Sequence, residues 1–281
     1  MNWLACGQHI PLEGRALIMG ILNVTPDSFS DGGTYFDPQK AVDHLFSMIQ
    51  NVAEIIDIGG ESTRPGATTV DEEEEIKRVK PILQAVGHRC PVPISIDTRK
   101  ASVARMALDL GAIIVNDISG LRDDVHMARV VAESGAGVVL MHRQGTSETM
   151  QQSPAYVDVV SEVKSFLAHR LDVAVENGIS LDQIVIDPGI GFGKTVSHNL
   201  QLIRHCAEFL EFGHPVMVGV SNKAFIGKII DKPIEKRMSG TAAAVAIAIF
   251  QGVHIIRVHD VGAMRDVREV AVSLRDHTCT I

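Results

Sequence analysis

Hydrogen-bonding and charged side chains stand at the carboxyl end of almost every short apolar run in this 281-residue sequence. Together they supply amides, carboxylates, imidazoles and a hydroxyl, all of which form hydrogen bonds. The set comprises Asn23, Asp57, Asp97, Asn116, Asp117, His142, Asp187, Ser221, His259 and Asp260. A single polar residue can end a strand simply because a loop begins there. Recurrence at nearly every run predicts instead one polar site that is built from many strand ends.

The apolar runs alternate with longer segments of helical periodicity. The runs occupy residues 17–24, 55–58, 93–96, 113–115, 137–141, 184–186, 216–220 and 255–258. Such continuous runs are typical of strands buried on both faces of a parallel sheet. Helices are expected at 38–52, 73–86, 100–110, 157–177, 199–212 and 263–274. About eight β-then-α repeats predict a single-domain (β/α)8 TIM barrel over residues 1–281, which would bring the polar strand ends to one face. A doubly wound open sheet is the alternative fold.

Composition and charge exclude several classes of protein. The formal net charge is −8, so no global positive field favours nucleic acid. The four cysteines lie singly, without zinc-site or disulfide-scaffold spacing. The longest apolar run, 241–250, is well short of the roughly 20 residues that a membrane span needs. A cytoplasmic protein is expected. The acidic run 71–75 is expected to cap a helix and to face solvent.

Two common nucleotide-binding motifs are not present. Residues 187–195 end in Gly-Lys-Thr, but the first glycine of a P-loop falls on Pro188. Proline has a fixed φ and no N–H, so the phosphate-binding nest of backbone donors does not form. The sequence also contains no G-x-G-x-x-G dinucleotide fingerprint and no H-E-x-x-H zinc motif.

Two segments are far less generic. They are 19–33 (MGILNVTPDSFSDGG) and 56–66 (IDIGGESTRPG), and together they resemble the paired signature of the dihydropteroate synthases. The resemblance continues in order through SIDT at 95–98, NDI at 116–118, LMH at 140–142, DPGIGFGK at 187–194 and IRVHD at 256–260. Because it extends over essentially the whole chain, the sequence is identified as a member of that family.

The resemblance implies a TIM-barrel enzyme of folate biosynthesis that is the target of sulfonamides. Such an enzyme condenses 6-hydroxymethyl-7,8-dihydropterin pyrophosphate with p-aminobenzoate, giving 7,8-dihydropteroate and pyrophosphate with the help of Mg²⁺. The implied pterin-binding residues are Asp97, Asn116, Asp187 and Lys223. Carboxylates suit the guanidine-like edge of a pterin because they accept two parallel hydrogen bonds.

The resemblance also implies sites for the other ligands. Thr63, Arg257 and His259 are expected on the pyrophosphate, and Asn23 on Mg²⁺, a cation that binds through few protein oxygens plus substrate phosphates. Arg257 and His259 alternate along one strand, so their side chains point the same way. The residues expected on p-aminobenzoate are Phe29, Arg64, Pro65, Phe192 and Ser221.

The implied reaction is substitution at the pterin methylene with early departure of pyrophosphate and without a covalent enzyme intermediate. The expected catalytic residues are Lys223, Asp97, Asp27 and Arg257. Arg257, His259 and Mg²⁺ would stabilise the leaving charge. Loops 25–37 and 60–71, which are long for βα connections, would close over the site. The apolar segment 239–251 predicts a helix and, with the resemblance, a homodimer.

The sequence departs from the family pattern in two places. Ser221-Asn222-Lys223-Ala224 stands where Ser-Arg-Lys-Ser is expected, so a hydroxyl for the p-aminobenzoate carboxylate and one positive charge are missing. Weaker inhibition by sulfonamides is therefore predicted, with Ala224→Ser restoring it. Val52 stands where the family usually has glycine, and we expect only a packing change there.

Two other functions compete with the synthase. A methyltetrahydrofolate:corrinoid methyltransferase would share the Asp/Asn/Asp pterin set but would not need Arg257 and His259 for pyrophosphate. A catalytically weak pterin-binding paralogue would fit the changes at Asn222 and Ala224. Pterin binding without turnover would identify the paralogue.

Overall fold

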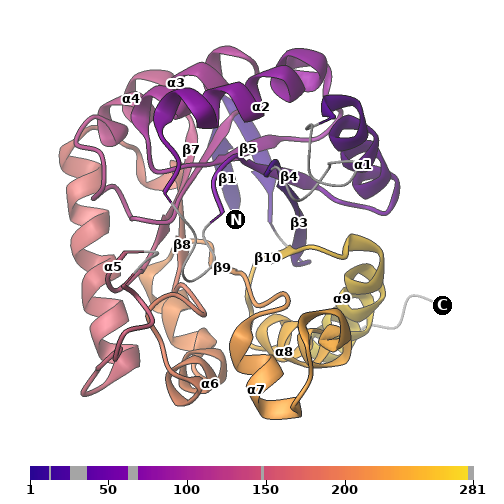
Figure 1. Ribbon diagram of the computed structural model, residues 1–281. Helices are drawn as coiled ribbons and strands as arrows, with labels where there is room; N and C mark the ends of the chain where they lie inside the picture. Colours follow the sequence, from indigo (N-terminus) through magenta and orange to yellow (C-terminus); the bar gives the residue numbers. More distant parts are fainter. Residues whose placement is uncertain (13, 26–36, 63–68, 147–148, 278–281) are drawn as a thin grey trace.

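Eight parallel strands form the central sheet of the protein (Figure 1). The computed structural model describes residues 1–12, 14–25, 37–62, 69–146 and 149–277. The sheet has the order β8-β7-β6-β5-β4-β3-β10-β9, and Ile186 pairs in parallel with Val216, which joins its two ends into a barrel. The strands are β3 (Leu17–Asn23), β4 (Ile55–Gly59), β5 (Ile94–Asp97), β6 (Ile114–Asp117), β7 (Gly137–Met141), β8 (Ile184–Asp187), β9 (Met217–Val218) and β10 (Ile255–Val258). The predicted (β/α)8 architecture is confirmed, and the open-sheet alternative is wrong.

Helices surround the barrel on its outer side (Figure 1). They are α1 (Pro38–Gln50), α2 (Glu72–Val86), α3 (Ala101–Asp109), α4 (Met127–Ser134), α5 (Val159–Glu176), α6 (Val196–Arg204), α7 (Ala224–Ile230), α8 (Met238–Phe250) and α9 (Val261–Asp276), with short 3-10 helices η1 (Gly87–Arg89), η2 (Leu181–Gln183), η3 (Cys206–Phe212) and η4 (Ile234–Lys236). The expected helix 199–212 is instead two elements, α6 and η3. Helices α4 and α7 were not predicted because seven or eight residues give too little periodicity to detect.

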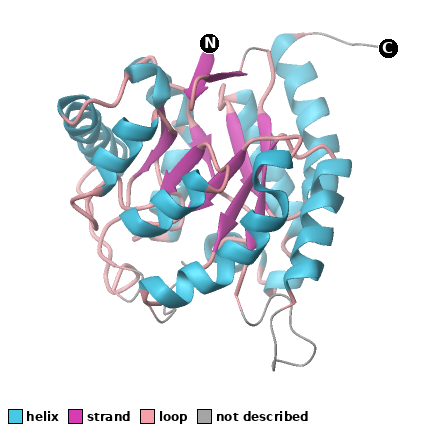
Figure 2. Ribbon diagram, turned by 90° about the horizontal axis from the view of Figure 1, so that it is seen from above, coloured by secondary structure: helices cyan, strands magenta, loops and turns pink. Residues whose placement is uncertain are grey.

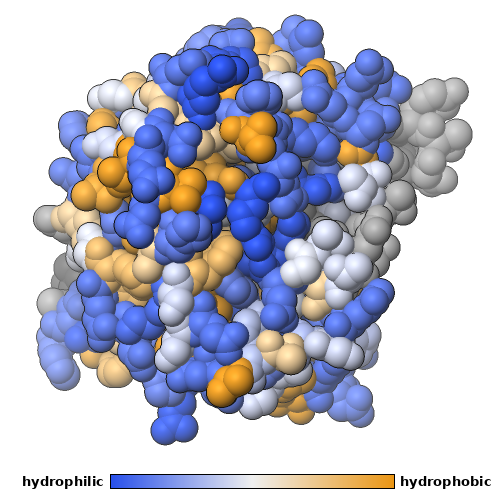
Figure 3. Space-filling model, turned by 90° about the vertical axis from the view of Figure 1, so that its left-hand side faces the viewer, coloured by the Kyte–Doolittle hydropathy of each residue, from blue (hydrophilic) through white to orange (hydrophobic). Residues whose placement is uncertain are grey.

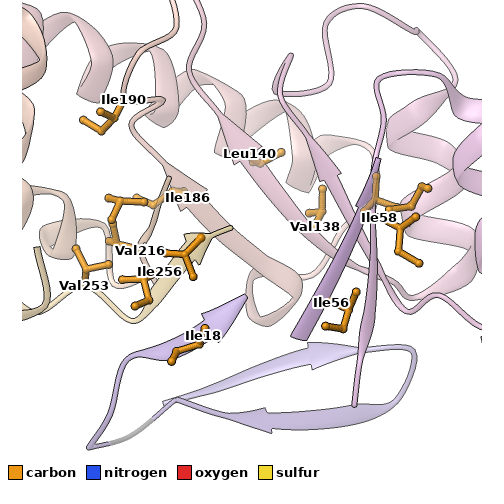
Figure 4. Close-up of a cluster of buried hydrophobic side chains, with 14 of the residues drawn as sticks. Ile18, Ile56, Ile58, Val138, Leu140, Ile186, Ile190, Val216, Val253 and Ile256 are labelled. Carbon is orange, nitrogen blue, oxygen red and sulfur yellow. The ribbon is translucent and has the colours of Figure 1, made fainter. Parts of the chain in front are cut away.

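Each barrel strand sends alternate side chains outward to the helices and inward to the barrel axis. On β4, Ile56 and Ile58 belong to the large outer cluster of buried apolar residues, part of which Figure 4 shows. The intervening Ile55 lies in a second apolar cluster, while Asp57 contacts polar side chains of β6 and β10. The barrel interior therefore changes from apolar to polar along the strand direction, and this change creates the site.

An N-terminal hairpin, which the sequence did not reveal, covers the amino-terminal end of the barrel. It consists of the antiparallel strands β1 (Asn2–Ala5) and β2 (Gln8–Pro11), and it lies at one end of the strands in Figure 2. Trp3 is fully buried among the lower interior side chains and donates a hydrogen bond from Nε1 to Gln183 O at 2.7 Å. The hairpin thus seals the end opposite the polar strand ends.

Helix α1 ends in a Schellman motif whose left-handed residue is Val52. Val52 N–H donates to Ile49 O, Ala53 N–H donates to Met48 O, and Val52 has a φ of 77°. This position normally takes glycine, because a Cβ is strained there. The departure at Val52 is therefore a change of backbone strain, and the expectation of a packing change alone is wrong.

The surface mixes hydrophilic side chains with small groups of apolar ones on the face seen in Figure 3. No helix among the described residues is long and apolar enough to cross a membrane. The cytoplasmic location inferred from the sequence stays a prediction.

Candidate functional site

Four side chains from four strands form an ion-pair cluster inside the carboxyl end of the barrel. Arg257 on β10 donates from Nε to Asp57 Oδ2 on β4 and from Nη2 to Asp97 Oδ2 on β5, both at 2.6 Å. Asn116 on β6 donates from Nδ2 to the same Asp57 oxygen at 2.8 Å. The two carboxylates and the amide are at least nine-tenths buried. The structure therefore brings the expected Asp97, Asn116 and Arg257 together, with Asp57 at their centre.

A second group contains the expected Asp187, Lys223 and Phe192. Asp187 ends β8, is 3% exposed, and accepts a hydrogen bond from Gly189 N–H. The Lys223 ammonium lies 4.0 Å from the centroid of the Phe192 ring, which is a cation–π contact. The charge of Arg257 lowers the pKa of Lys223, and the charge of Asp187 raises it. The Lys223 ammonium therefore interacts electrostatically with this group and with the ion-pair cluster around Arg257.

A cavity of about 450 Å³ opens above these groups. Its wall includes six of the predicted site residues, namely Asn23, Phe192, Ser221, Lys223, Arg257 and His259. Asp97, Asn116 and Asp187 are not on the wall, whereas Arg257, which donates to Asp97, is. A ligand that binds Asp97 Oδ2 from the cavity must therefore displace Arg257 from this oxygen.

Ser221 and His259 meet at the rim of the cavity. Ser221 Oγ lies 3.0 Å from His259 Nδ1 and accepts from His259 N–H at 3.3 Å. Asn222 follows with a φ of 58°, and its carbonyl accepts from Arg237 Nη1. Asparagine tolerates this left-handed conformation better than most residues. Ala224 begins α7 and lies on the cavity wall, at the position where the family pattern has a serine.

Burial shifts the protonation equilibria of the site. It raises the pKa of Asp97 to about 7, which Arg257 opposes and Asp57 reinforces, and it raises the pKa of Asp187 to about 6. Burial and the neighbouring Arg257 lower the pKa of Lys223 to about 8. The carboxylates are thus poised to change charge near neutral pH, and a cationic ligand edge would favour their ionised forms.

Three of the polar strand ends do not join the site. Asp117 accepts from the N–H groups of Ser119 and Leu121 in the following turn, and Asp260 caps α9 through Ala263 N–H. His142 Nδ1 lies 2.9 Å from the buried Lys194 ammonium, and burial lowers the pKa of His142 to about 2. The expected Asp27, Phe29, Thr63, Arg64 and Pro65 lie outside the described residues. Their predicted roles stay predictions.

Sequence reasoning missed two features that support the site. Lys194 donates to the carbonyls of Gly189 and Phe192, which fastens the loop between Asp187 and α6. An ion-pair network at the mouth joins Glu61 to Arg99 and Lys100, and Arg99 to Asp123. The charges were visible in the sequence, but nothing in their spacing showed that they meet.

Comparison with known proteins agrees with this geometry. A family model described as pterin binding enzyme matches residues 19–259. The dihydropteroate synthase of Escherichia coli K12 is 48% identical over 93% of this chain and 92% of its own length. That of Synechocystis is 47% identical over 92% of this chain and 90% of its own length.

Solved structures agree as well. A Yersinia pestis dihydropteroate synthase in a sulfonamide drug complex has a TM-score of 0.93 and 41% identity, covering 98% of this chain and all of the other. A Xanthomonas albilineans dihydropteroate synthase with 4-aminobenzoic acid has a TM-score of 0.90 and 40% identity, covering 98% of this chain and 99% of the other.

Proposed function

This chain belongs to the dihydropteroate synthase family of pterin-binding enzymes, and we propose that it joins dihydropterin pyrophosphate to p-aminobenzoate and releases pyrophosphate. The observation that carries the proposal is that Arg257 and Lys223 line one cavity while the buried acceptors Asp97, Asn116 and Asp187 lie behind them, linked to these cations by hydrogen bonds or by charge. The buried acceptors match the donor edge of a pterin, and the overlying cations match a pyrophosphate.

The pterin would lie deepest, on Asp97, Asn116 and Asp187. Asn116 already donates its Nδ2 to Asp57, so its carbonyl oxygen, which has no partner among the described residues, is left as an acceptor. Lys223 would reach the pterin carbonyl and ring nitrogen from its position over Phe192. The pterin would therefore donate hydrogen bonds to the buried acceptors and accept from Lys223.

The pyrophosphate would lie toward the rim, on Arg257 and His259, with Thr63 from the second loop. Both Arg257 and His259 lie on the cavity wall. The p-aminobenzoate would stack against Phe192 with Phe29, Arg64 and Pro65, and Ser221 would contact its carboxylate. Ser221 and His259 already touch, which supports neighbouring sites for the carboxylate and the leaving anion.

Mg²⁺ fits the donor set of the cavity wall. Asn23 ends β3 on that wall and offers a neutral oxygen beside Arg257 and His259. Among the described residues no three His, Cys, Asp or Glu side chains gather as an all-protein metal site. One protein oxygen plus waters and phosphates is the usual environment of Mg²⁺. When bound, the ion would supply positive charge to the leaving pyrophosphate.

The chain's own residues would promote a dissociative substitution. Asp97 and Asp187 orient the pterin, while Arg257 and His259 stabilise the charge that develops on the leaving group. The arylamine is neutral near pH 7, so it attacks the methylene carbon without a strong base and then loses its proton. Departure of pyrophosphate leaves a positive charge on the pterin methylene. Asp27, in the first loop, would help to close the site over this pterin cation and exclude water.

A second copy of the chain would pack on α8 and α9. Apolar side chains that are at least half exposed occur on both helices, namely Ile247 and Phe250 on α8 and Val270 and Leu274 on α9. The two helices pack on each other, and α7 lies beside them (Figure 1). Phe250→Glu is expected to shift the sedimentation profile from dimer to monomer, whereas Val125→Glu, at an exposed apolar residue remote from these helices, leaves it unchanged.

The activity test follows dihydropteroate and pyrophosphate together, with dihydropterin pyrophosphate, labelled p-aminobenzoate and Mg²⁺. Equal amounts of both products are expected. Chelation of Mg²⁺ is expected to abolish product formation, and added Mg²⁺ is expected to restore it. Lys223→Ala removes the cation above the pterin and is expected to lower kcat/KM at least a hundredfold, a loss of about 3 kcal/mol. Lys80→Ala, at an exposed lysine on α2, is the matched control. Pterin binding without product would identify the pterin-binding paralogue instead.

A further inference from the structure

Asp57 is the one charged side chain of the interior cluster with no expected role. It is fully buried on β4, and its Oδ2 accepts from both Arg257 Nε and Asn116 Nδ2. Arg257 is expected on the pyrophosphate and Asn116 on the pterin. One carboxylate oxygen therefore joins the two ends of the substrate site.

Arg257 pairs with Asp97, an expected pterin ligand. Its Nη2 donates to Asp97 Oδ2 at 2.6 Å. A guanidinium and the 2-amino-pyrimidinone edge of a pterin both present N–H donors to a carboxylate, so they compete for the same acceptor. When a pterin takes Asp97 Oδ2, Asp57 remains as the one carboxylate that is paired with Arg257 among the described residues.

We propose that Asp57 is a positioning residue that keeps Arg257 paired while its guanidinium passes from Asp97 to the substrate pyrophosphate. The inference rests on the proposed function. Asp57 holds Nε, the atom nearest the aliphatic stem, so the outer nitrogens are free to turn about this anchor. The pterin takes Asp97, the pyrophosphate takes the outer nitrogens, and no buried charge is left alone at any stage.

The proposal predicts a specific defect when the Asp57 charge is removed. In Asp57→Asn the amide oxygen is able to accept from both Arg257 Nε and Asn116 Nδ2, and the amide nitrogen replaces Oδ1, which has no partner among the described residues. The shape of the pocket is therefore kept. A pterin that takes Asp97 then leaves the Arg257 charge without a carboxylate, which is costly in a buried site. Pyrophosphate supplies the missing negative charge and removes that cost.

The test measures the Kd of 6-hydroxymethylpterin, which carries no phosphate, by calorimetry with and without saturating inorganic pyrophosphate at one fixed Mg²⁺ concentration. For the wild type, pyrophosphate is expected to lower the pterin Kd about fivefold, the lower end of ordinary coupling between sites. For Asp57→Asn, the Kd without pyrophosphate rises about thirtyfold, and with pyrophosphate it returns to within about threefold of the wild type, a coupling of about fiftyfold.

Asp117→Asn is the matched control, because Asp117 is equally buried but accepts from the backbone N–H groups of Ser119 and Leu121. Its pyrophosphate dependence is expected to match the wild type. An Asp57→Asn loss that is the same with and without pyrophosphate, or no loss at all, overturns the inference while leaving the synthase assignment intact. A wild-type protein that binds no pterin, with or without pyrophosphate, overturns both the inference on Asp57 and the synthase assignment.

The wild type provides a second measurement that does not depend on the folding of a variant. Coupling between two ligands is reciprocal, so the pterin must lower the pyrophosphate Kd by the same factor of about five. A factor of one in either direction overturns the exchange of partners at Arg257.

Discussion

Replacing Val52 by glycine is expected to stabilise the protein. Val52 follows the C-cap of α1 with a φ of 77°, and the two hydrogen bonds of the Schellman motif hold it there. For an L-residue the left-handed conformation costs about 1–2 kcal/mol, and a β-branched side chain makes it a genuine outlier. Val52 is 36% exposed, so glycine also gives up part of the apolar contact of this side chain.

The net effect is the difference between the released strain and two costs. Glycine releases the strain, about 2 kcal/mol for this β-branched residue. It also gives the unfolded chain more freedom, which costs about 0.4–1 kcal/mol, and it loses the buried part of the Val52 side chain, which costs about 0.5–1 kcal/mol. The expected gain in the free energy of unfolding is therefore at most about 1 kcal/mol, which corresponds to roughly 2 °C in Tm for a chain of this size.

Equilibrium unfolding in urea measures this gain, with refolding checked from high denaturant. Val52→Ala is the matched comparison, because it removes nearly the same apolar surface but keeps the strained Cβ. Val52→Gly is expected to be about 1 kcal/mol more stable than Val52→Ala. If alanine proved equal to or better than glycine at this position, the strain argument would be refuted.

Three further predictions concern the site. Because the carboxylate of Asp97 must be ionised to accept from the pterin and burial raises its pKa to about 7, kcat/KM for the pterin substrate is expected to fall as pH drops below about 7. In Asp97→Asn the acid limb should move to about 6, the pKa of Asp187, and an unmoved limb would contradict the assignment. Ala224→Ser is expected to lower the sulfonamide inhibition constant. Equal inhibition constants for the variant and the wild type would contradict this prediction. Lys194→Met leaves the carbonyls of Gly189 and Phe192 without their donor, so urea unfolding should show a loss of about 2–4 kcal/mol, and an unchanged midpoint would rule out its role as a fastener.

The strands and their polar ends were predictable because both depend on local pattern. Seven of the eight apolar runs, from the run at β3 to that at β8 and the run at β10, lie within a residue or two of the observed strands, since parallel strands buried on both faces leave a continuous apolar signal. The run at 216–220 was too long, because only Met217–Val218 form β9. The carboxyl-end rule of the barrel then placed Asp97, Asn116 and Asp187 together without any contact being known.

The sequence could not show which charges pair. Asp57 and Arg257 are 200 positions apart, and their contact at 2.6 Å exists only because β4 and β10 face the same barrel interior. The acidic run 71–75 illustrates the same limit. Asp71 caps α2 as expected, but Glu75 points inward, is fully buried and pairs with Lys100, so the expectation that it faces solvent is wrong.

The sequence by itself determined the barrel, the face on which the polar residues gather and the family to which the chain belongs, because these depend on periodicity, strand ends and motifs along the chain. Only the tertiary structure decided that Asp57 anchors Arg257, that Arg257 pairs with Asp97, and that Val52 is strained. The physical reason is that ion pairs and backbone dihedrals depend on distances in space, which a closed barrel fixes between residues that are remote in sequence.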